Sequence, residues 1–187
     1  DMHKAEVADH FRINHFHLGA DIGNSAPSKG LPDNAHNILD RIRSCPSFLM
    51  VGTIEPRKGY RQVLEAFTRL WDQGADVNLV FVGKKGWLVD ELVNYIETHP
   101  ELGDRLLWLE SISDEYLEEV YAACSCLLAA SEGEGFGLPL IEAAQKGLPI
   151  IARDIPVFRE VAGDHAYYFA DSLAEEPLVE AVQQWLI

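Results

Sequence analysis

The fold is decided by the stretch Cys126-Leu-Leu-Ala-Ala130-Ser-Glu-Gly-Glu134-Gly-Phe-Gly-Leu-Pro-Leu-Ile-Glu142. Its first residues are apolar and predict a buried strand. Gly135 and Gly137 then predict a turn that passes close to a ligand, and Pro139 is typical of the first turn of a helix. A strand followed by a flexible turn and a helix N-terminus presents backbone N–H groups to an anion. The stretch therefore predicts an anion site, with one of the carboxylates Glu134 and Glu142 meeting a polar group near the anion and the other a diol further out.

On both sides of this stretch, strand and helix patterns alternate. Apolar runs predict strands over residues 47–53, 77–83, 105–109, 126–130, 148–152 and 165–169. Helical patterns cover residues 57–73, 88–98, 113–123, 138–146, a short segment from residue 156, and 176–186. The strands are continuously apolar, which indicates a parallel sheet covered on both faces. We predict a doubly wound, Rossmann-like α/β domain whose ligand lies outside the carboxyl ends of the strands.

Residues 1–46 differ from the rest of the chain, because they are rich in His, Asn, Pro, Gly and Ser. They contain one extended stretch, 12–18, and one helix-like piece near 33–43. We assign residues 1–46 to a linker or flank and residues 47–187 to the domain. His15 and His17 would share one face of a strand, but no cysteine or carboxylate spacing completes a metal site, so we expect none.

The charge balance excludes one class of partner. Asp and Glu number 30 against 15 Lys and Arg, so the net charge is -15. That charge argues against nucleic acid as a partner.

No apolar run is long enough to span a bilayer, and no signal peptide opens the sequence. Three cysteines, Cys45, Cys124 and Cys126, lack the spacing of a disulfide framework, so we expect free thiols and a cytoplasmic location.

A small basic corner lies within this acidic sequence. The first expected strand ends in Gly52-Thr-Ile-Glu-Pro-Arg-Lys-Gly59, which places Arg57 and Lys58 where the chain turns into a helix. Arginine binds phosphate as a fork and lysine as a mobile point charge. We therefore expect these two cations to meet a phosphate whose other oxygens face the 134–138 turn.

Together, Gly52…Pro56-Arg-Lys-Gly59 and Glu134-Gly-Phe-Gly-Leu-Pro…Glu142 resemble the nucleotide-sugar-binding half of retaining group 1 (family 4) glycosyltransferases. Those enzymes have the two-Rossmann-domain GT-B architecture, and the resemblance runs from about residue 47 to the C-terminus. Residues 18–21 also resemble the stretch that joins the two domains.

The resemblance implies a role for each matching residue. Lys58, helped by Arg57, would bind the donor diphosphate, Glu134 the sugar hydroxyls near the reacting carbon, and Glu142 the ribose hydroxyls. Catalysis would thus rest on Glu134, Lys58 and Arg57. The remaining donor-binding candidates lie in the loops after the strands: Gly52, Thr53, Lys84, Ser111, Ile112, Gly135, Phe136, Gly137 and Leu138.

One position departs from the family pattern. Many members have arginine directly after the glycine of the first loop, where this chain has Thr53. The Glu55-Pro-Arg-Lys58 variant resembles bacterial mannosyltransferases, and Arg57 is the candidate to replace the missing charge. The sequence alone leaves the geometry of this phosphate clamp open.

The resemblance also implies the reaction. A sugar would pass from a nucleotide diphosphate, with GDP-mannose favoured over UDP-sugars, to a glycan or lipid-linked acceptor in polysaccharide or lipopolysaccharide assembly. The anomeric configuration would be retained and no divalent metal needed. The acceptor site of the family lies largely on an N-terminal domain for which this chain is too short. We therefore expect the isolated domain to bind donor without turnover. Peripheral contact of a longer protein with the inner face of the cytoplasmic membrane also fits the resemblance.

Three alternatives stay open from the residues. Two carboxylates flanking a glycosidic bond would suit a hydrolase, although the phosphate-facing features have no purpose there. A nucleotide-sugar epimerase or a phosphorylase-like GT-B enzyme shares the two-domain plan but requires acid–base or cofactor residues that this sequence does not show. A non-catalytic nucleotide-sugar-binding module is the third alternative.

Overall fold

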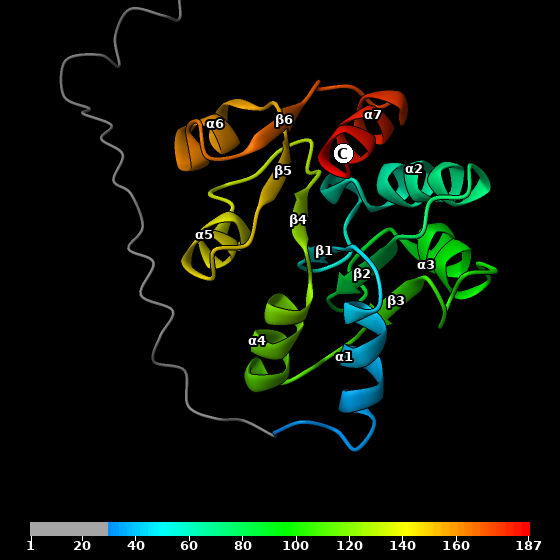
Figure 1. Ribbon diagram of the computed structural model, residues 1–187. Helices are drawn as coiled ribbons and strands as arrows, with labels where there is room; N and C mark the ends of the chain where they lie inside the picture. The colour runs from blue at the N-terminus through cyan, green and yellow to red at the C-terminus, as the bar shows by residue number, and fades with distance from the viewer. Residues whose placement is uncertain (1–29) are drawn as a thin grey trace, which may run out of the picture.

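The computed structural model describes residues 30–187 and shows one parallel sheet between two layers of helices (Figure 1). The sheet has six strands in the order β3-β2-β1-β4-β5-β6. In chain order the strands are β1 (Ser47–Val51), β2 (Asn78–Val82), β3 (Leu106–Leu109), β4 (Cys126–Ala129), β5 (Ile150–Arg153) and β6 (Tyr167–Phe169). All neighbouring strands run parallel, so the loops after their carboxyl ends gather at one edge of the sheet.

Helices cover both faces of the sheet, which explains why its strands are mostly apolar. One face packs against α2 (Tyr60–Asp72), α3 (Asp90–Glu97) and α7 (Glu176–Trp185) in one hydrophobic cluster. The other face packs against α1 (Ala35–Arg43), α4 (Asp114–Ala123), α5 (Leu138–Gln145) and α6 (Pro156–Ala162) in a second. The doubly wound Rossmann-like fold predicted from the sequence is confirmed.

The expected helix over 57–73 is wrong at its start. The chain forms a short 3₁₀ turn, η1 (Pro56–Lys58), and α2 begins only at Tyr60. Gly59 separates the two with φ of 76°, in the left-handed region. An ideal Cβ on Gly59 would lie 2.3 Å from the carbonyl oxygen of Ala130, so the backbones after β1 and β4 touch here. This break frees Arg57 and Lys58 from the helix and places them in the loop.

Gly59→Ala is expected to destabilise the domain by roughly 2–5 kcal/mol, because the side chain meets both an unfavourable φ and the Ala130 carbonyl. Gly74→Ala is the matched control: its φ is 85° but nothing lies within 4 Å of an added Cβ. That control should lose only about 1–2 kcal/mol. Urea unfolding of the two variants measures the difference, and equal losses would contradict the close contact.

Within the range assigned to the flank, the helix-like piece near 33–43 forms α1. Ala35, Leu39 and Ile42 are buried in the same cluster as α4, so α1 packs with the domain rather than apart from it. The expected extended stretch 12–18, the histidine pair His15 and His17, and the joining segment 18–21 lie outside the described residues.

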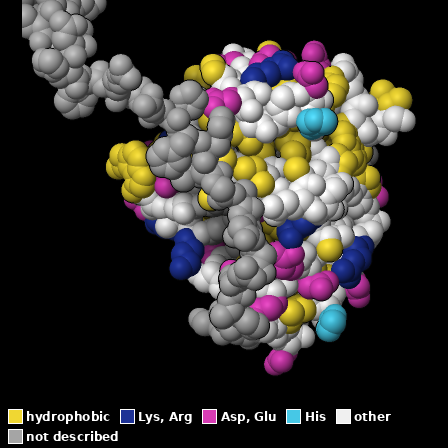
Figure 2. All heavy atoms as spheres, turned by 90° about the vertical axis from the view of Figure 1, so that its left-hand side faces the viewer, with side chains coloured by type: hydrophobic (Ala, Val, Ile, Leu, Met, Phe, Trp, Pro, Cys, Tyr) yellow, Lys and Arg dark blue, Asp and Glu magenta, His cyan; other side chains and the backbone are white. Residues whose placement is uncertain are grey.

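The surface of the described part agrees with the acidic composition. Figure 2 shows the side with α5 and α6, where basic side chains are scattered among acidic ones and form no continuous patch in the described residues. No helix in residues 30–187 has the length and apolarity needed to cross a membrane. Cys45, Cys124 and Cys126 are free, and burial raises the pKa of both Cys124 and Cys126 to about 12.

Candidate active site

The strand order reverses between β1 and β4, and the loops after these two strands meet at that switch point. The backbone N–H of Glu132 donates to the carbonyl oxygen of Arg57 at 2.8 Å, which ties the two loops together. The basic corner from the first loop and the carboxylate turn from the second therefore share one cleft, as the sequence predicts.

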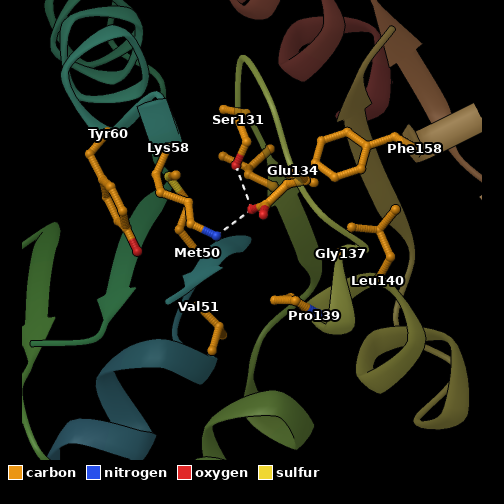
Figure 3. A pocket seen from close by; sticks show the side chains of 13 residues that line it. Met50, Val51, Lys58, Tyr60, Ser131, Glu134, Gly137, Pro139, Leu140 and Phe158 are labelled. Carbon is orange, nitrogen blue, oxygen red and sulfur yellow. Dashed lines mark hydrogen bonds and ion pairs between the residues drawn. The ribbon is translucent and has the colours of Figure 1, made fainter. Parts of the chain in front are cut away.

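Glu134 is the centre of the polar contacts in this cleft. Lys58 Nζ forms an ion pair with Glu134 Oε1, and Arg57 Nη1 lies 3.0 Å from Oε2. Ser131 Oγ donates a further hydrogen bond to Oε1 at 3.0 Å. The side chain of Glu134 is only 11% exposed and that of Lys58 16%, whereas Arg57 is 46% exposed. Figure 3 shows Lys58 and Ser131 both directed at the Glu134 carboxylate, to which dashed lines join them.

These contacts keep Glu134 ionised. Burial raises the pKa of Glu134, but the hydrogen bonds from Lys58 and Arg57 together outweigh burial and hold that pKa below its usual range. Arg57 also pairs with Glu55 at 3.1 Å and donates to the carbonyl oxygen of Gly133 at 2.7 Å. The two cations are therefore balanced by two carboxylates, Glu134 and Glu55.

Hydrogen bonds and a close backbone contact hold the loop after β1 in place. Tyr60 is buried, and its hydroxyl donates to the carbonyl oxygen of Gly52 at 2.6 Å. An ideal Cβ on Gly83 would lie 1.9 Å from that same oxygen, so the loops after β1 and β2 are in backbone contact. Trp108 Nε1 in turn donates to the carbonyl oxygen of Gly83 at 2.9 Å. This chain of contacts fixes the loop that presents Lys58.

The opposite wall of the cleft is apolar. Gly137, Pro139, Leu140 and Phe158 line it, while Lys58, Tyr60 and Glu134 line the polar side (Figure 3). Gly137 precedes α5 directly, so the N-terminus of that helix lies beside the cleft. The positive end of the helix dipole therefore adds to the positive charge of Lys58 and Arg57.

The structure places the other predicted residues along the same edge of the sheet, at different distances from this centre. An ideal Cβ on Gly52 would lie 3.8 Å from Lys58 Nζ. Thr53 and Lys84 are exposed in loops that a hydrogen bond from Ile54 N to the Lys84 carbonyl oxygen, 2.9 Å, joins. The remaining residues follow β3 and β4: Ser111, Ile112, Gly135, Phe136 and Leu138.

Two of these residues have distinctive environments. Ser111 is exposed and has φ of 53°, a left-handed conformation that residues other than glycine rarely adopt. Such conformations are found at ligand-binding positions more often than elsewhere. Ile112 is half-buried against the α4 side of the core. Among residues 30–187, neither residue is hydrogen-bonded or ion-paired to Lys58 or Glu134.

Glu142 lies in the second turn of α5, and its Oε2 accepts a hydrogen bond from the Tyr121 hydroxyl at 2.6 Å. It does not line the cleft around Lys58 and Glu134. The two carboxylates of the quoted stretch are therefore in different environments: Glu134 is held by cations, and Glu142 by a neutral donor.

Sequence reasoning missed four residues at the site. Ser131 follows β4 directly, and a polar residue at the carboxyl end of a strand is a signal that could have found it. Tyr60 follows Gly59, where the 3₁₀ turn ends and α2 begins, and the sequence pattern gave no sign of this break. Phe158 and Tyr121 come from α6 and α4, and no local signal connects them with the cleft. Among residues 30–187, no group of three or more His, Cys, Asp or Glu side chains is placed to hold a metal ion.

Comparisons with known proteins agree with this geometry. Residues 35–187 match the family model described as "Glycosyl transferases group 1". The chain is 55% identical over 174 residues to the serotype-specific mannosyltransferase WbdA of Escherichia coli, a match that covers 93% of this chain and 21% of that protein. It is 35% identical over 117 residues to the O-antigen chain mannosyltransferase B of Escherichia coli, covering 62% of this chain and 30% of that protein.

A solved structure agrees in fold. The C-terminal domain of a glycosyl transferase group 1 family protein (LpcC) from Francisella tularensis superposes with a TM-score of 0.67 at 18% identity, covering 86% of this chain and 84% of that one. The chain spans about a fifth of the length of the first curated relatives that it matches.

Proposed function

This chain belongs to the group 1 glycosyltransferases, and from that premise we propose that it is the donor-binding domain of a retaining mannosyltransferase that uses GDP-mannose. The observation that supports this proposal most is the convergence of Lys58, Arg57 and Glu134 at the switch point, next to the N-terminus of α5. A diphosphate needs concentrated positive charge, and a sugar needs a hydrogen-bond acceptor beside it; this cleft provides both.

In the proposed reaction, the bond between the sugar C1 and the β-phosphate oxygen breaks, and its electron pair stays on that oxygen. Lys58, Arg57 and the α5 N-terminus stabilise the growing negative charge. The acceptor hydroxyl oxygen bonds to C1 on the same face, and its proton passes to the leaving phosphate oxygen, so the configuration is retained. Glu134 orients the sugar hydroxyls and supports the positive character of the ring. Because the protein supplies the cations, we propose that transfer needs no divalent metal.

The rest of the nucleotide would extend along the carboxyl edge of the sheet. In the proposal, Glu142 binds the ribose hydroxyls and the loops after β2 and β3 lie near the base. Ser111 lies in the loop after β3, and its left-handed backbone conformation supports a ligand role for that loop. Thr53 stands where many family members have arginine, and it provides no charge. Arg57, whose guanidinium contacts Glu134, is proposed to supply that charge instead.

The choice of mannose rests on the relatives. Both Escherichia coli proteins are named as mannosyltransferases, and one as an O-antigen chain enzyme. We propose that this chain likewise serves lipopolysaccharide O-antigen synthesis, at the cytoplasmic side of the membrane. The glycan or lipid-linked acceptor would bind a second domain in a longer protein, because the chain covers only 21% of its 55% identical relative. The chain alone would then bind donor without turnover.

Calorimetry tests the proposal: GDP, UDP and ADP are titrated into the chain in a buffer that contains EDTA. We expect GDP to bind, with UDP and ADP weaker, and EDTA to make no difference because Lys58 and Arg57 replace the metal. Binding of GDP only after Mg²⁺ is added would contradict the metal-free mechanism. No heat and no thermal shift with any nucleotide at millimolar concentration would contradict the site itself.

A further inference from the structure

Tyr121 is a buried residue whose hydroxyl makes one hydrogen bond within residues 30–187. It belongs to α4, its side chain is 2% exposed, and it packs within the cluster on that face of the sheet. Burial, and next the nearby negative charge of Glu142, raise the pKa of Tyr121 above its ordinary value, so the hydroxyl keeps its proton at physiological pH. The hydroxyl is therefore a permanent donor, and it donates to Glu142 Oε2 at 2.6 Å.

This donor constrains a residue of the proposed donor site. Glu142 is half-buried in α5, and within residues 30–187 no other hydrogen bond to its carboxylate is found. A carboxylate on a flexible side chain loses rotamer freedom when it binds a ligand. With Oε2 held by Tyr121, Oε1 is left to accept from a ligand, and part of this entropy is lost before the ligand arrives.

The Tyr121 ring is itself fixed between the two helices. Lys146, the C-cap residue of α5, lies over the ring, 5.6 Å from its centroid, and also forms an ion pair with Glu118 of α4. These contacts join α4 to α5 one turn beyond Glu142. Most buried hydroxyls are hydrogen-bonded, whereas phenylalanine would fill the same space without a partner. The hydrogen bond to Glu142 therefore accounts for a tyrosine rather than a phenylalanine at position 121.

We propose that Tyr121 is a positioning residue that orients the Glu142 carboxylate toward the ribose diol of the nucleotide. This inference rests on the proposed function, because it assigns the ribose to Glu142. Tyr121 does not touch the nucleotide; it acts through Glu142. The variant Tyr121→Phe should therefore weaken recognition of the ribose hydroxyls while the diphosphate contacts of Lys58 persist.

The readout is the ratio of the Kd for 2′,3′-dideoxy-GDP to the Kd for GDP, measured by calorimetry. In the unaltered chain we expect a ratio of about 10 to 100, the value of hydrogen bonds to a charged acceptor. Y121F should lower this ratio about tenfold by weakening GDP while leaving dideoxy-GDP unchanged. The double variant Y121F/E142Q should lower it no further than E142Q alone, because the two residues act as one unit.

Tyr116→Phe is the matched control. Tyr116 lies on the same helix, is also 2% exposed, and its hydroxyl has no hydrogen-bond partner among the described residues. Y116F should leave the ratio unchanged, so a loss of ratio in Y121F alone excludes a general effect of removing a buried hydroxyl. Thermal unfolding of both variants shows that each is folded at the temperature of the titrations.

The outcomes separate this inference from the proposed function. If the unaltered chain discriminates dideoxy-GDP and Y121F keeps the full ratio, the positioning role is overturned while the donor site stands. If GDP binds without any discrimination, or discrimination survives in E142Q, the ribose contact of Glu142 is wrong and the inference falls with it. If GDP does not bind at all, the proposed function fails first.

Discussion

Replacing Lys58 with alanine is expected to weaken GDP binding about 10- to 100-fold. Lys58 is the most enclosed cation of the cleft, since its side chain is 16% exposed, and its ammonium group lies at the junction of the two loops. A charge-assisted hydrogen bond contributes about 1.5–3 kcal/mol, and its loss leaves the diphosphate to Arg57 and the α5 N-terminus. Calorimetric Kd values for GDP measure the effect.

Lys85→Ala is the control for this variant. Lys85 is another lysine in a loop at the same edge of the sheet, but it is ion-paired with Asp90 on the neighbouring helix α3. We expect its removal to change the GDP Kd less than threefold, since surface ion pairs contribute about 0–1 kcal/mol. If both variants bound GDP equally, net charge rather than a specific site would explain the binding.

Glu134→Gln is expected to have opposite effects on binding and on transfer. Glu134 holds both Lys58 and Arg57 in this structure, so a phosphate must compete with its carboxylate for them. Glutamine removes that competitor, and we expect GDP to bind about tenfold more tightly, a change of 1.4 kcal/mol. Transfer by a protein that contains both domains should fall by about 10²–10³, because the sugar loses its charged acceptor and the ring its electrostatic support.

Glu132→Gln provides the comparison, because Glu132 is an exposed carboxylate in the same turn. It should leave both GDP affinity and transfer near those of the unaltered protein. Parallel losses of GDP affinity and transfer in Glu134→Gln would indicate that Glu134 only keeps the turn folded. Unchanged transfer would indicate a binding module or a different catalytic group.

The sequence predicts the sheet well because its signal is local. The inner strands are mostly apolar runs buried on both faces, and β2 is buried along its whole length. The helix predicted over residues 113–123 is α4, and its cap is Ser113, whose hydroxyl accepts from Tyr116 N at 3.1 Å. The break at Gly59 escaped prediction because the helical stripe of apolar residues continues across it, and only contact with Ala130 requires the left-handed turn.

The site is predicted in part for a related reason. Because parallel strands end at one edge, the loops carrying Lys58 and Glu134 were expected to converge although they lie 76 residues apart. Their direct ion pair was not foreseen; we expected each to face the ligand. Side chains that reach the site from a helix, such as Phe158 and Tyr121, depend on packing between distant segments, and one sequence contains no signal for it.

A crystal structure of this chain with GDP tests the central claim most directly. We predict that a phosphate oxygen lies within about 3 Å of Lys58 Nζ, with the diphosphate facing the backbone N–H groups at the start of α5. Lys58 should have left Glu134 to make that contact. A nucleotide bound elsewhere on the domain, with Lys58 still paired to Glu134, would contradict the account.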